Sequence, residues 1–321
     1  MLTERDDYTH DVGPESNFNE SMYFEFHDPD TGVAGFLRLA NRPNEGSGER
    51  TVCLYLPDGT LGFSFDRPRV TSNTSMHAAG LAVEVVRPLH EVRVRFEGDL
   101  SLVSDPSAMA DPKAALSSSP VVNSRITLQY WAMAPAHEET FEAPGQSFAP
   151  HHYEQLALVT GDIAIGQNRY PVRGQGLRDH SWGPRSWQAP WFYRWLHGST
   201  DDFGFMAAYF GDQDGSSRVG GFVFDGTELH RCDQVSINTA RDTRGYQRQI
   251  DLRIASGRRE WHLRGDTLAS VPLRHRRKDG QGQTRIIEST VRWRREDGTR
   301  LHGMAEYLDQ VLDGQPVGIR V

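Results

Sequence analysis

The chain has 321 residues, of which 37% are hydrophobic and 24% are charged, and its formal net charge is −8. This length predicts two domains or one large β architecture, and the composition is typical of a soluble globular protein. Its 35 Lys and Arg residues against 43 Asp and Glu argue against nucleic acid as a main partner, because phosphate binding needs clustered positive charge.

The start of the chain and its cysteines indicate a compartment. Residues 1–17 are polar and acidic and lack the apolar core of a signal peptide. The sequence also lacks an apolar run of the roughly 18 residues that a membrane span needs. Cys53 and Cys232 lie far apart, outside any CxxC motif, and are expected to be buried free thiols in a reducing compartment. We therefore expect a cytoplasmic protein without a membrane span.

Strand patterns occupy the first half of the chain. Alternating apolar and polar residues are separated by turn sequences, and Pro57-Asp58-Gly59 is a strong hairpin signal between two of them. The strands expected in this half are 23–27, 34–39, 52–56, 61–65, 81–87, 91–97, 126–133 and 153–165. Residues 104–123 form a Ser-, Pro- and Ala-rich excursion that is either a surface loop or a lid over a barrel mouth. The best helix candidate, 106–116, lies within it and is interrupted by Pro112.

The second half repeats this style. The strands expected there are 203–210, 218–224, 228–237, 246–254, 259–263, 284–294 and 301–307. Many short strands at regular spacing favour a sandwich or barrel over a βαβ fold. The sequence therefore predicts an all-β protein of two tandem lipocalin-like β-barrels or sandwiches, joined by a Trp-rich central segment. The expected domains are residues 1–172 and 173–321.

The central segment, residues 174–198, reads GQGLRDHSWGPRSWQAPWFYRWLHG and holds four of the seven tryptophans. Aromatic surface beside an acid, an imidazole and guanidinium groups is what a small-molecule site needs. His180 titrates in the range for general acid–base chemistry. Burial of Asp179 beside aromatic surface would raise the pKa of its carboxyl group and make it a proton donor near neutral pH.

Alternation separates the two candidate acids. On an extended strand, Arg178, His180 and Trp182 share one face, and Asp179 and Ser181 share the other. We therefore expect one of the pair to act in catalysis while the other holds the domain junction, and we favour His180 with Trp182 as the pocket pair. Asp179 is alternatively a structural ion-pair partner of a nearby arginine.

Further aromatic and polar residues complete the predicted substrate-binding set. Its members are Trp182, Arg185, Trp187, Trp191, Tyr193 and Trp195. Some of these tryptophans are alternatively ordinary core residues, and Tyr193 a core tyrosine with a satisfied hydroxyl. On strand 301–307, Glu306 is the best second acid if it faces inward.

Metal and cofactor signals are weak. His151 and His152 with Asp179, His180 and His197 offer donor atoms, but HExxH, HxH and facial-triad spacings are absent from the sequence. Gly174-Gln175-Gly176 lacks the third glycine and the following helix of a dinucleotide site. We expect neither a metal nor a cofactor.

Residues 178–185, RDHSWGPR, between two β-rich halves, resemble the central motif of the two-domain, lipocalin-like hydratase family, which includes carotenoid 1,2-hydratase and kievitone hydratase. Residues 18–23 and 42–46 are similar to bacterial relatives. The resemblance implies two lipocalin-like barrels and cofactor-free acid–base chemistry on lipophilic molecules. By motif position, His180 and Trp182 match the family's His and Trp.

The resemblance also assigns a tyrosine. Tyr209 is the nearest match to the family's Tyr on a following strand, but Gly211 stands where the family has Asp, and Asp212 is offset by one. The departure puts alkene hydration itself in doubt. The prediction is an enzyme of hydro-lyase, isomerase or cyclase type, acting on a hydrophobic isoprenoid, steroid-like or polyketide-like molecule, with His180, Asp179 and Tyr209 catalytic. The alternative is a non-catalytic binder or carrier of a lipophilic metabolite.

Overall fold

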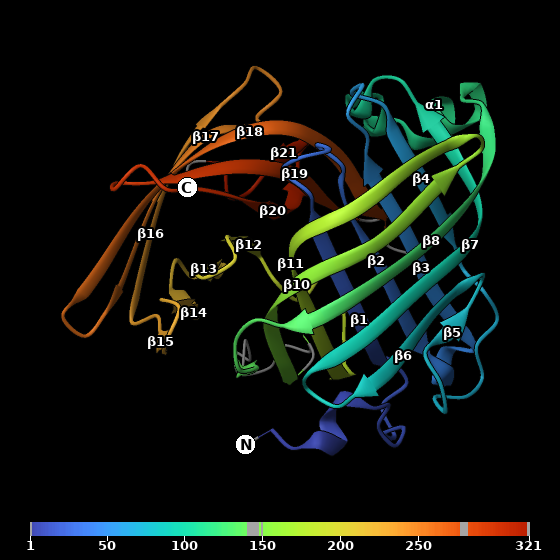
Figure 1. Cartoon of the computed structure of the whole chain (residues 1–321), viewed down its shortest axis with the longest axis horizontal. Helices are drawn as coiled ribbons and strands as arrows, with labels where there is room; N and C mark the ends of the chain where they lie inside the picture. Colours follow the sequence, from blue (N-terminus) through green and yellow to red (C-terminus); the bar gives the residue numbers. More distant parts are fainter. Residues whose placement is uncertain (1, 140–147, 149, 277–281, 320–321) are drawn as a thin grey trace. The chain divides into compact units, whose positions relative to one another are not determined.

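Antiparallel strands supply nearly all the regular structure, as the sequence predicted. The computed structural model describes residues 2–139, 148, 150–276 and 282–319. Its contacts divide the chain into two units (Figure 1). The first comprises Met1–Asp105 with Lys113–Ser186, and the second comprises Pro106–Pro112 with Trp187–Val321.

The first unit is a closed barrel preceded by a short 3₁₀ helix, η1 (Glu4–Asp7). Its strands are β1 (Phe18–His27), β2 (Ala34–Arg42), β3 (Ser47–Tyr55), β4 (Leu61–Asp66), β5 (His77–Ala78), β6 (Leu81–Arg87), β7 (Glu91–Val103), β8 (Val121–Ala132), β9 (His137–Glu138), β10 (His151–Ile165) and β11 (Asn168–Pro184). The ladder runs β4-β3-β2-β1-β11-β10-β8-β7, and pairing between β7 and β4 closes it into a ring of eight strands. A second 3₁₀ turn, η2 (Pro43–Glu45), links β2 to β3.

The barrel interior follows from strand alternation. On β1, Met22, Phe24 and Phe26 belong to the buried apolar cluster, as do Val159 and Ile163 on β10. Side chains at alternate positions point to one face, so these residues define the inner face of the barrel. An eight-stranded barrel is just wide enough for side chains to fill or for one small ligand.

The second unit is a single sheet that curves around its own core. Its strands are β12 (Phe192–Ser199), β13 (Gly204–Gly211), β14 (Ser217–Phe224), β15 (Leu229–Arg231), β16 (Gln234–Arg241), β17 (Gln247–Ser256), β18 (Arg259–Arg276), β19 (Gln283–Arg295), β20 (Arg300–Leu312) and β21 (Gln315–Pro316). The order is β15-β14-β13-β12-β20-β19-β18-β17-β16, with β21 paired to β20. Fully buried side chains such as Phe205, Leu252 and Trp293 form the core.

Two predicted elements are divided in the structure. The predicted strand 228–237 is wrong as a single strand. The N–H of Cys232 donates to Gly221 on β14 and that of Asp233 donates to Ala255 on β17, which breaks the strand into β15 and β16. The helix candidate 106–116 forms two short pieces separated near Pro112, as expected, namely η3 (Pro106–Ala110) and α1 (Pro112–Ser118).

The boundary between the two units differs from the predicted one. The boundary expected at residue 172 falls inside β11, which pairs with β10 over residues 168–182 and with β1 over residues 175–184. The two units divide after Ser186. Both cysteines are buried thiols outside any disulfide, as predicted. Among the described residues, none of the helices is long and apolar enough to cross a membrane.

Candidate functional site

Strand β11 directs three residues of the central motif into the first barrel. His180 pairs with Met22 on β1, and Arg178 pairs with Phe24. Residues directly opposite in an antiparallel ladder share a face, and Met22 and Phe24 belong to the apolar interior. Arg178, His180 and Trp182 therefore lie on the inner face, which confirms the grouping predicted by alternation.

A carboxylate on β1 meets two imidazoles at this inner face. His180 Nε2 lies 2.8 Å from Glu20 Oε1, and His10 Nδ1 lies 2.8 Å from the same oxygen. The backbone N–H of His10 donates to the other oxygen, Oε2, at 2.9 Å. The amide of Asn73 also donates to Oε2 through a short hydrogen bond. Glu20 thus has a full set of donors although its side chain has no exposed surface.

The charge of Glu20 is fixed by these donors. Burial alone would raise the pKa of its carboxyl group, but hydrogen bonds from His10 and His180, with the charge of His180, lower that pKa to about 2. Hydrogen bonds to the charged form outweigh desolvation here. Glu20 is therefore an anion across the physiological range, and the ring nitrogens that face it act as donors.

Trp182 forms an aromatic wall beside this cluster. Its indole stacks on the His10 ring at a centroid separation of 3.8 Å and an interplanar angle of 9°. His151 stacks near it at 5.3 Å, and His180 lies tilted at 5.1 Å. Trp182 is only partly buried. Part of the indole is therefore exposed to solvent, whereas Glu20 and His180 beside it are buried.

A second network adjoins the first. The Arg178 guanidinium donates to Asp7 Oδ1 at 2.5 Å, and Tyr153 donates its hydroxyl to the same oxygen at 2.5 Å. Arg178 also donates through Nε to Gln155 Oε1 at 2.8 Å. Burial opposes ionisation of Asp7, but the charge and hydrogen bonds of Arg178 prevail and lower the pKa of that carboxyl. The N-terminal segment is thus bound to the barrel interior through Asp7 and His10.

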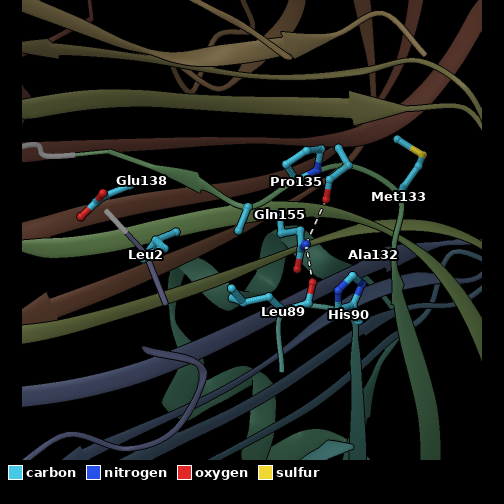
Figure 2. Close-up of a pocket in the computed structure, with 10 residues that line it drawn as sticks. Leu2, Leu89, His90, Ala132, Met133, Pro135, Glu138 and Gln155 are labelled. Atoms are coloured by element: carbon cyan, nitrogen blue, oxygen red, sulfur yellow. Dashed lines mark hydrogen bonds between the residues drawn. The ribbon is translucent and has the colours of Figure 1, made fainter. Parts of the chain in front are cut away.

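A pocket opens next to this network (Figure 2). Its volume is about 650 Å³, within the range of small-molecule sites. Gln155 lies at its polar side and donates to the main-chain oxygens of Leu89 and Ala134, both at 2.9 Å. The pocket is lined mainly by apolar residues: Leu2, Leu89, His90, Ala132, Met133, Ala134, Pro135, Ala136, Glu138 and Gln155.

Asp179 lies on the opposite face of β11 and is not the expected neutral acid. Its carboxylate pairs with His152 Nε2 at 3.1 Å. Burial would raise the pKa of Asp179, but the charges of His152, Arg185 and Arg38 lower it. The same pairing raises the pKa of His152 against its burial. The prediction of a raised pKa was therefore wrong, because a cationic partner offsets desolvation.

The remaining predicted residues are distributed over both units. In the first, Arg185 donates to Ser181 Oγ at 3.2 Å and lies over the Phe148 ring. The others belong to the second unit, where Trp187 stacks on His275 at 4.5 Å. Tyr209 stacks near Phe192 at 6.2 Å. The backbone N–H of Gln310 donates to the Trp191 carbonyl oxygen at 3.0 Å.

On strand β12, Leu196 faces the core of the second unit. Because side chains alternate along a strand, Tyr193, Trp195 and His197 face away from that core. Trp195 and His197 make an edge contact at 4.8 Å. The Tyr193 hydroxyl donates to Glu306 in a short hydrogen bond, so it is satisfied, as the alternative interpretation expected. Glu306 shares this outer face, since Ala305 and Tyr307 face the core.

Comparison with known proteins places the chain in a family. Residues 3–311 match a family model described as a domain of unknown function, DUF7064. The chain belongs to this family. No curated protein matches the sequence.

Solved structures share the fold of this DUF7064 member. A candidate AttH from Nitrosomonas europaea has 19% identity and a TM-score of 0.60, over 92% of this chain and 94% of that chain. CghA with Sch210972 has 12% identity and a TM-score of 0.58, over 96% and 95%. Kievitone hydratase from Nectria haematococca has 10% identity and a TM-score of 0.59, over 96% and 92%. The fold implied by the sequence resemblance is thereby confirmed.

Donor sets for a metal occur twice among the described residues of this DUF7064 protein. One is His10, Glu20 and His180, and the other is His152, Glu154 and Asp179. Of the histidines that the sequence suggested together, His180 faces the interior, His152 lies on the opposite face, and His197 belongs to the second unit.

Sequence reasoning missed His10, Asp7 and Glu20. A signal for Glu20 exists, because it stands two positions before Met22 in the inner-facing series of β1. The predicted strand began at residue 23, which left Glu20 outside it. His10 carried no signal, since it precedes the first strand and reaches the site only through tertiary contacts.

Proposed function

We propose that this protein is an enzyme of hydro-lyase, isomerase or cyclase type that transfers a proton on a hydrophobic small molecule. His180 is the acid–base group, and Glu20 is the carboxylate that orients it. The observation that supports this is the 2.8 Å contact between His180 Nε2 and the buried Glu20 anion. A carboxylate that holds one ring nitrogen of a histidine fixes its tautomer and stabilises the imidazolium that forms.

The proton chemistry follows from that contact. Because Glu20 is an anion, His180 Nε2 carries a hydrogen, and in the neutral imidazole Nδ1 then has a free lone pair. Nδ1 is buried and has no hydrogen-bond partner among the described residues. In the proposed step, Nδ1 takes a proton from a substrate carbon or oxygen, and the imidazolium stays paired with Glu20. The imidazolium exchanges its Nδ1 hydrogen with water, and Nδ1 then delivers a proton to another substrate atom, so an isomerisation or cyclisation is balanced without a cofactor.

The substrate class is argued from the surroundings. The Trp182 ring offers an apolar, electron-rich face that favours lipophilic rings and developing positive charge. The pocket beside Gln155 is mainly apolar. Isoprenoid, steroid-like and polyketide-like molecules fit these features, and kievitone, which the fungal hydratase of the same fold is named for, is a suitable first probe.

The test follows conversion in deuterated water. Purified protein is incubated with kievitone and a panel of terpenoid and polyketide substrates, and products are followed by mass spectrometry. The wild type is expected to hydrate, isomerise or cyclise a panel member, with deuterium from the solvent in the product. Folded His180→Ala and Glu20→Gln variants that turn over the same substrate as fast as the wild type would exclude this site.

A carrier of a lipophilic metabolite is the second candidate function. The mainly apolar pocket of about 650 Å³ favours it, since binding there needs no proton transfer. A ligand that binds stoichiometrically, is recovered unchanged and exchanges no deuterium would support the carrier. Loss of its binding in Met133→Asp, which places a charge in the pocket, would locate it there.

A further inference from the structure

We propose that His10, Glu20 and His180 form a binding site for a divalent transition-metal ion, with zinc as the preferred ion. The three donor atoms converge on one point. His10 Nδ1 and His180 Nε2 each lie 2.8 Å from Glu20 Oε1, and all three atoms lie within 4.8 Å of one another. The inference goes beyond the proposed function, and the observations that support it do not require that function.

The donor set selects the class of metal. Two imidazole nitrogens and one carboxylate oxygen suit zinc and its neighbours in the first transition row, whereas calcium and magnesium prefer oxygen donors alone. Three protein ligands leave a fourth position of a tetrahedral ion open for water or another small ligand. The ligands come from the N-terminal segment, β1 and β11, so no short sequence motif predicts them as a set.

Neighbouring residues hold the His10 and Glu20 side chains in the orientation that metal binding needs. A ligating histidine usually donates its other ring N–H to a carboxylate, which fixes the ring. His10 Nε2 faces Asp6 Oδ1 at 3.4 Å, as this arrangement requires. The second oxygen of Glu20 accepts from the His10 backbone and from Asn73. Stacking on Trp182 at 3.8 Å further restricts the His10 ring.

Charge also favours a cation at this point. Glu20 has no exposed surface, and a buried anion needs a positive partner. A metal ion supplies that charge in place of the hydrogens that now lie between the imidazoles and Glu20. Each histidine then carries its proton on the other ring nitrogen, which is Nε2 on His10 and Nδ1 on His180. Zinc occupancy would therefore remove the free lone pair that the proposed proton transfer uses.

The experiment measures zinc binding directly on the untagged, full-length protein. Zinc chloride is titrated calorimetrically and in competition with a chromophoric chelator. We expect one zinc per chain, and we expect His10→Ala, Glu20→Gln and His180→Ala each to weaken binding by more than about 100-fold. Asp6→Asn replaces the carboxylate beside His10, which also accepts hydrogen bonds from Thr3, with a neutral amide and should weaken binding by about 10- to 100-fold. Cobalt(II) should give the visible absorption of a tetrahedral site in the wild type.

Two histidine variants act as matched controls. His230 lies in the second unit and pairs with Asp225 and Arg259, so His230→Ala should leave zinc affinity within about twofold. His152→Ala tests the other donor set on the first unit. Zinc binding that survives in folded His10→Ala and His180→Ala, or that is lost in His152→Ala alone, overturns the proposal, as does a wild type that binds no zinc. Circular dichroism and thermal melting verify the fold of each variant.

Discussion

At the scale of single residues, the candidate site depends on one buried carboxylate shared by two imidazoles. Glu20 is unexposed, and its two oxygens accept hydrogen bonds from His10, His180 and Asn73. Removing a partner leaves a buried charge unsatisfied, which costs more than the bond itself contributes. Small substitutions here are therefore expected to have large effects, whereas the same substitutions on the outer face of β11 are expected to have smaller ones.

Replacement of His180 by alanine is the first residue-scale prediction. It removes the proposed acid–base group, and turnover of a substrate identified in the panel should fall by about 10² to 10⁴. Asp179→Asn is the matched comparison on the adjacent position and should lower turnover by less than about tenfold, because Asp179 pairs with His152 on the other face. Equal losses of kcat in the two variants would contradict the assignment.

The second residue-scale prediction concerns acid stability. The pKa of Glu20 falls from its ordinary 4.5 to about 2 on folding, since hydrogen bonds from His10 and His180 outweigh burial. A depressed pKa contributes stability that is complete above pH 4.5 and is lost as the pH falls towards about 2. The interval corresponds to about 3 kcal/mol of unfolding free energy.

Denaturant unfolding of the wild type and Glu20→Gln between pH 2 and pH 6 measures this contribution. Asp7 and Asp179 also have lowered pKa values and act in both proteins, so the difference between the two curves isolates Glu20. The stability difference between the two proteins should shrink as the pH falls below 4.5. A difference that stays constant over this range would contradict the assignment.

How far the site could be predicted is also decided at single residues. His180 and Trp182 stood out because aromatic and ionisable residues are dense in the central motif, and alternation placed them on one face. The partner set could not be found in the same way. Glu20 sits at an inner position where an apolar residue is expected, and His10 lies outside every strand. Only the pairing of β1 with β11 brings them to His180.

At the scale of elements, β11 is shaped by close approach to β1. A Cβ on Gly176 would lie 2.0 Å from the carbonyl oxygen of Glu25, and that atom belongs to the backbone of the neighbouring strand. Backbone cannot move aside without breaking the ladder that aligns His180 with Met22. The glycine is thus part of what positions the site.

Gly176→Ala is therefore predicted to destabilise the protein by about 1–3 kcal/mol or more. Gly62→Ala is the control on β4, since its nearest neighbour is a flexible leucine methyl at 3.3 Å. The control should change stability by less than about 1 kcal/mol, because lower entropy of the unfolded chain offsets the contact. Urea denaturation of both variants provides the comparison, and equal losses would show that close approach is not the cause.

Elements with clear alternation were predictable, and those with polar inner faces were not. The strand expected at 81–87 coincides with β6, and most others were extended at one or both ends. By contrast, β11 was not assigned as a strand, because Arg178 and His180 occupy inner positions and glycines interrupt its apolar pattern. The part of the barrel that carries the candidate site departs from the ordinary strand pattern, so the length of β11 could not be predicted.

At the scale of the whole molecule, each unit has an apolar core of its own. The first core is drawn from Met22 to Val172, and the second from Leu196 to Tyr307, without a shared member among the described residues. All three proposed zinc ligands belong to the first unit. Separate cores predict separate cooperative unfolding, because cooperativity follows the packing that a region shares.

Trp293→Ala tests this separation. The Trp293 side chain is fully buried, donates through Nε1 to the His197 carbonyl at 3.0 Å and packs against Phe205. Its loss should cost about 3–5 kcal/mol. Hydrogen exchange measured by mass spectrometry should show lost protection in β12, β13, β19 and β20, while β1, β10 and β11 keep theirs. Zinc affinity, which depends on the first unit alone, should be unchanged in this variant. Simultaneous loss of protection in both sets of strands, with a fall in zinc affinity, would mean that the two cores unfold as one.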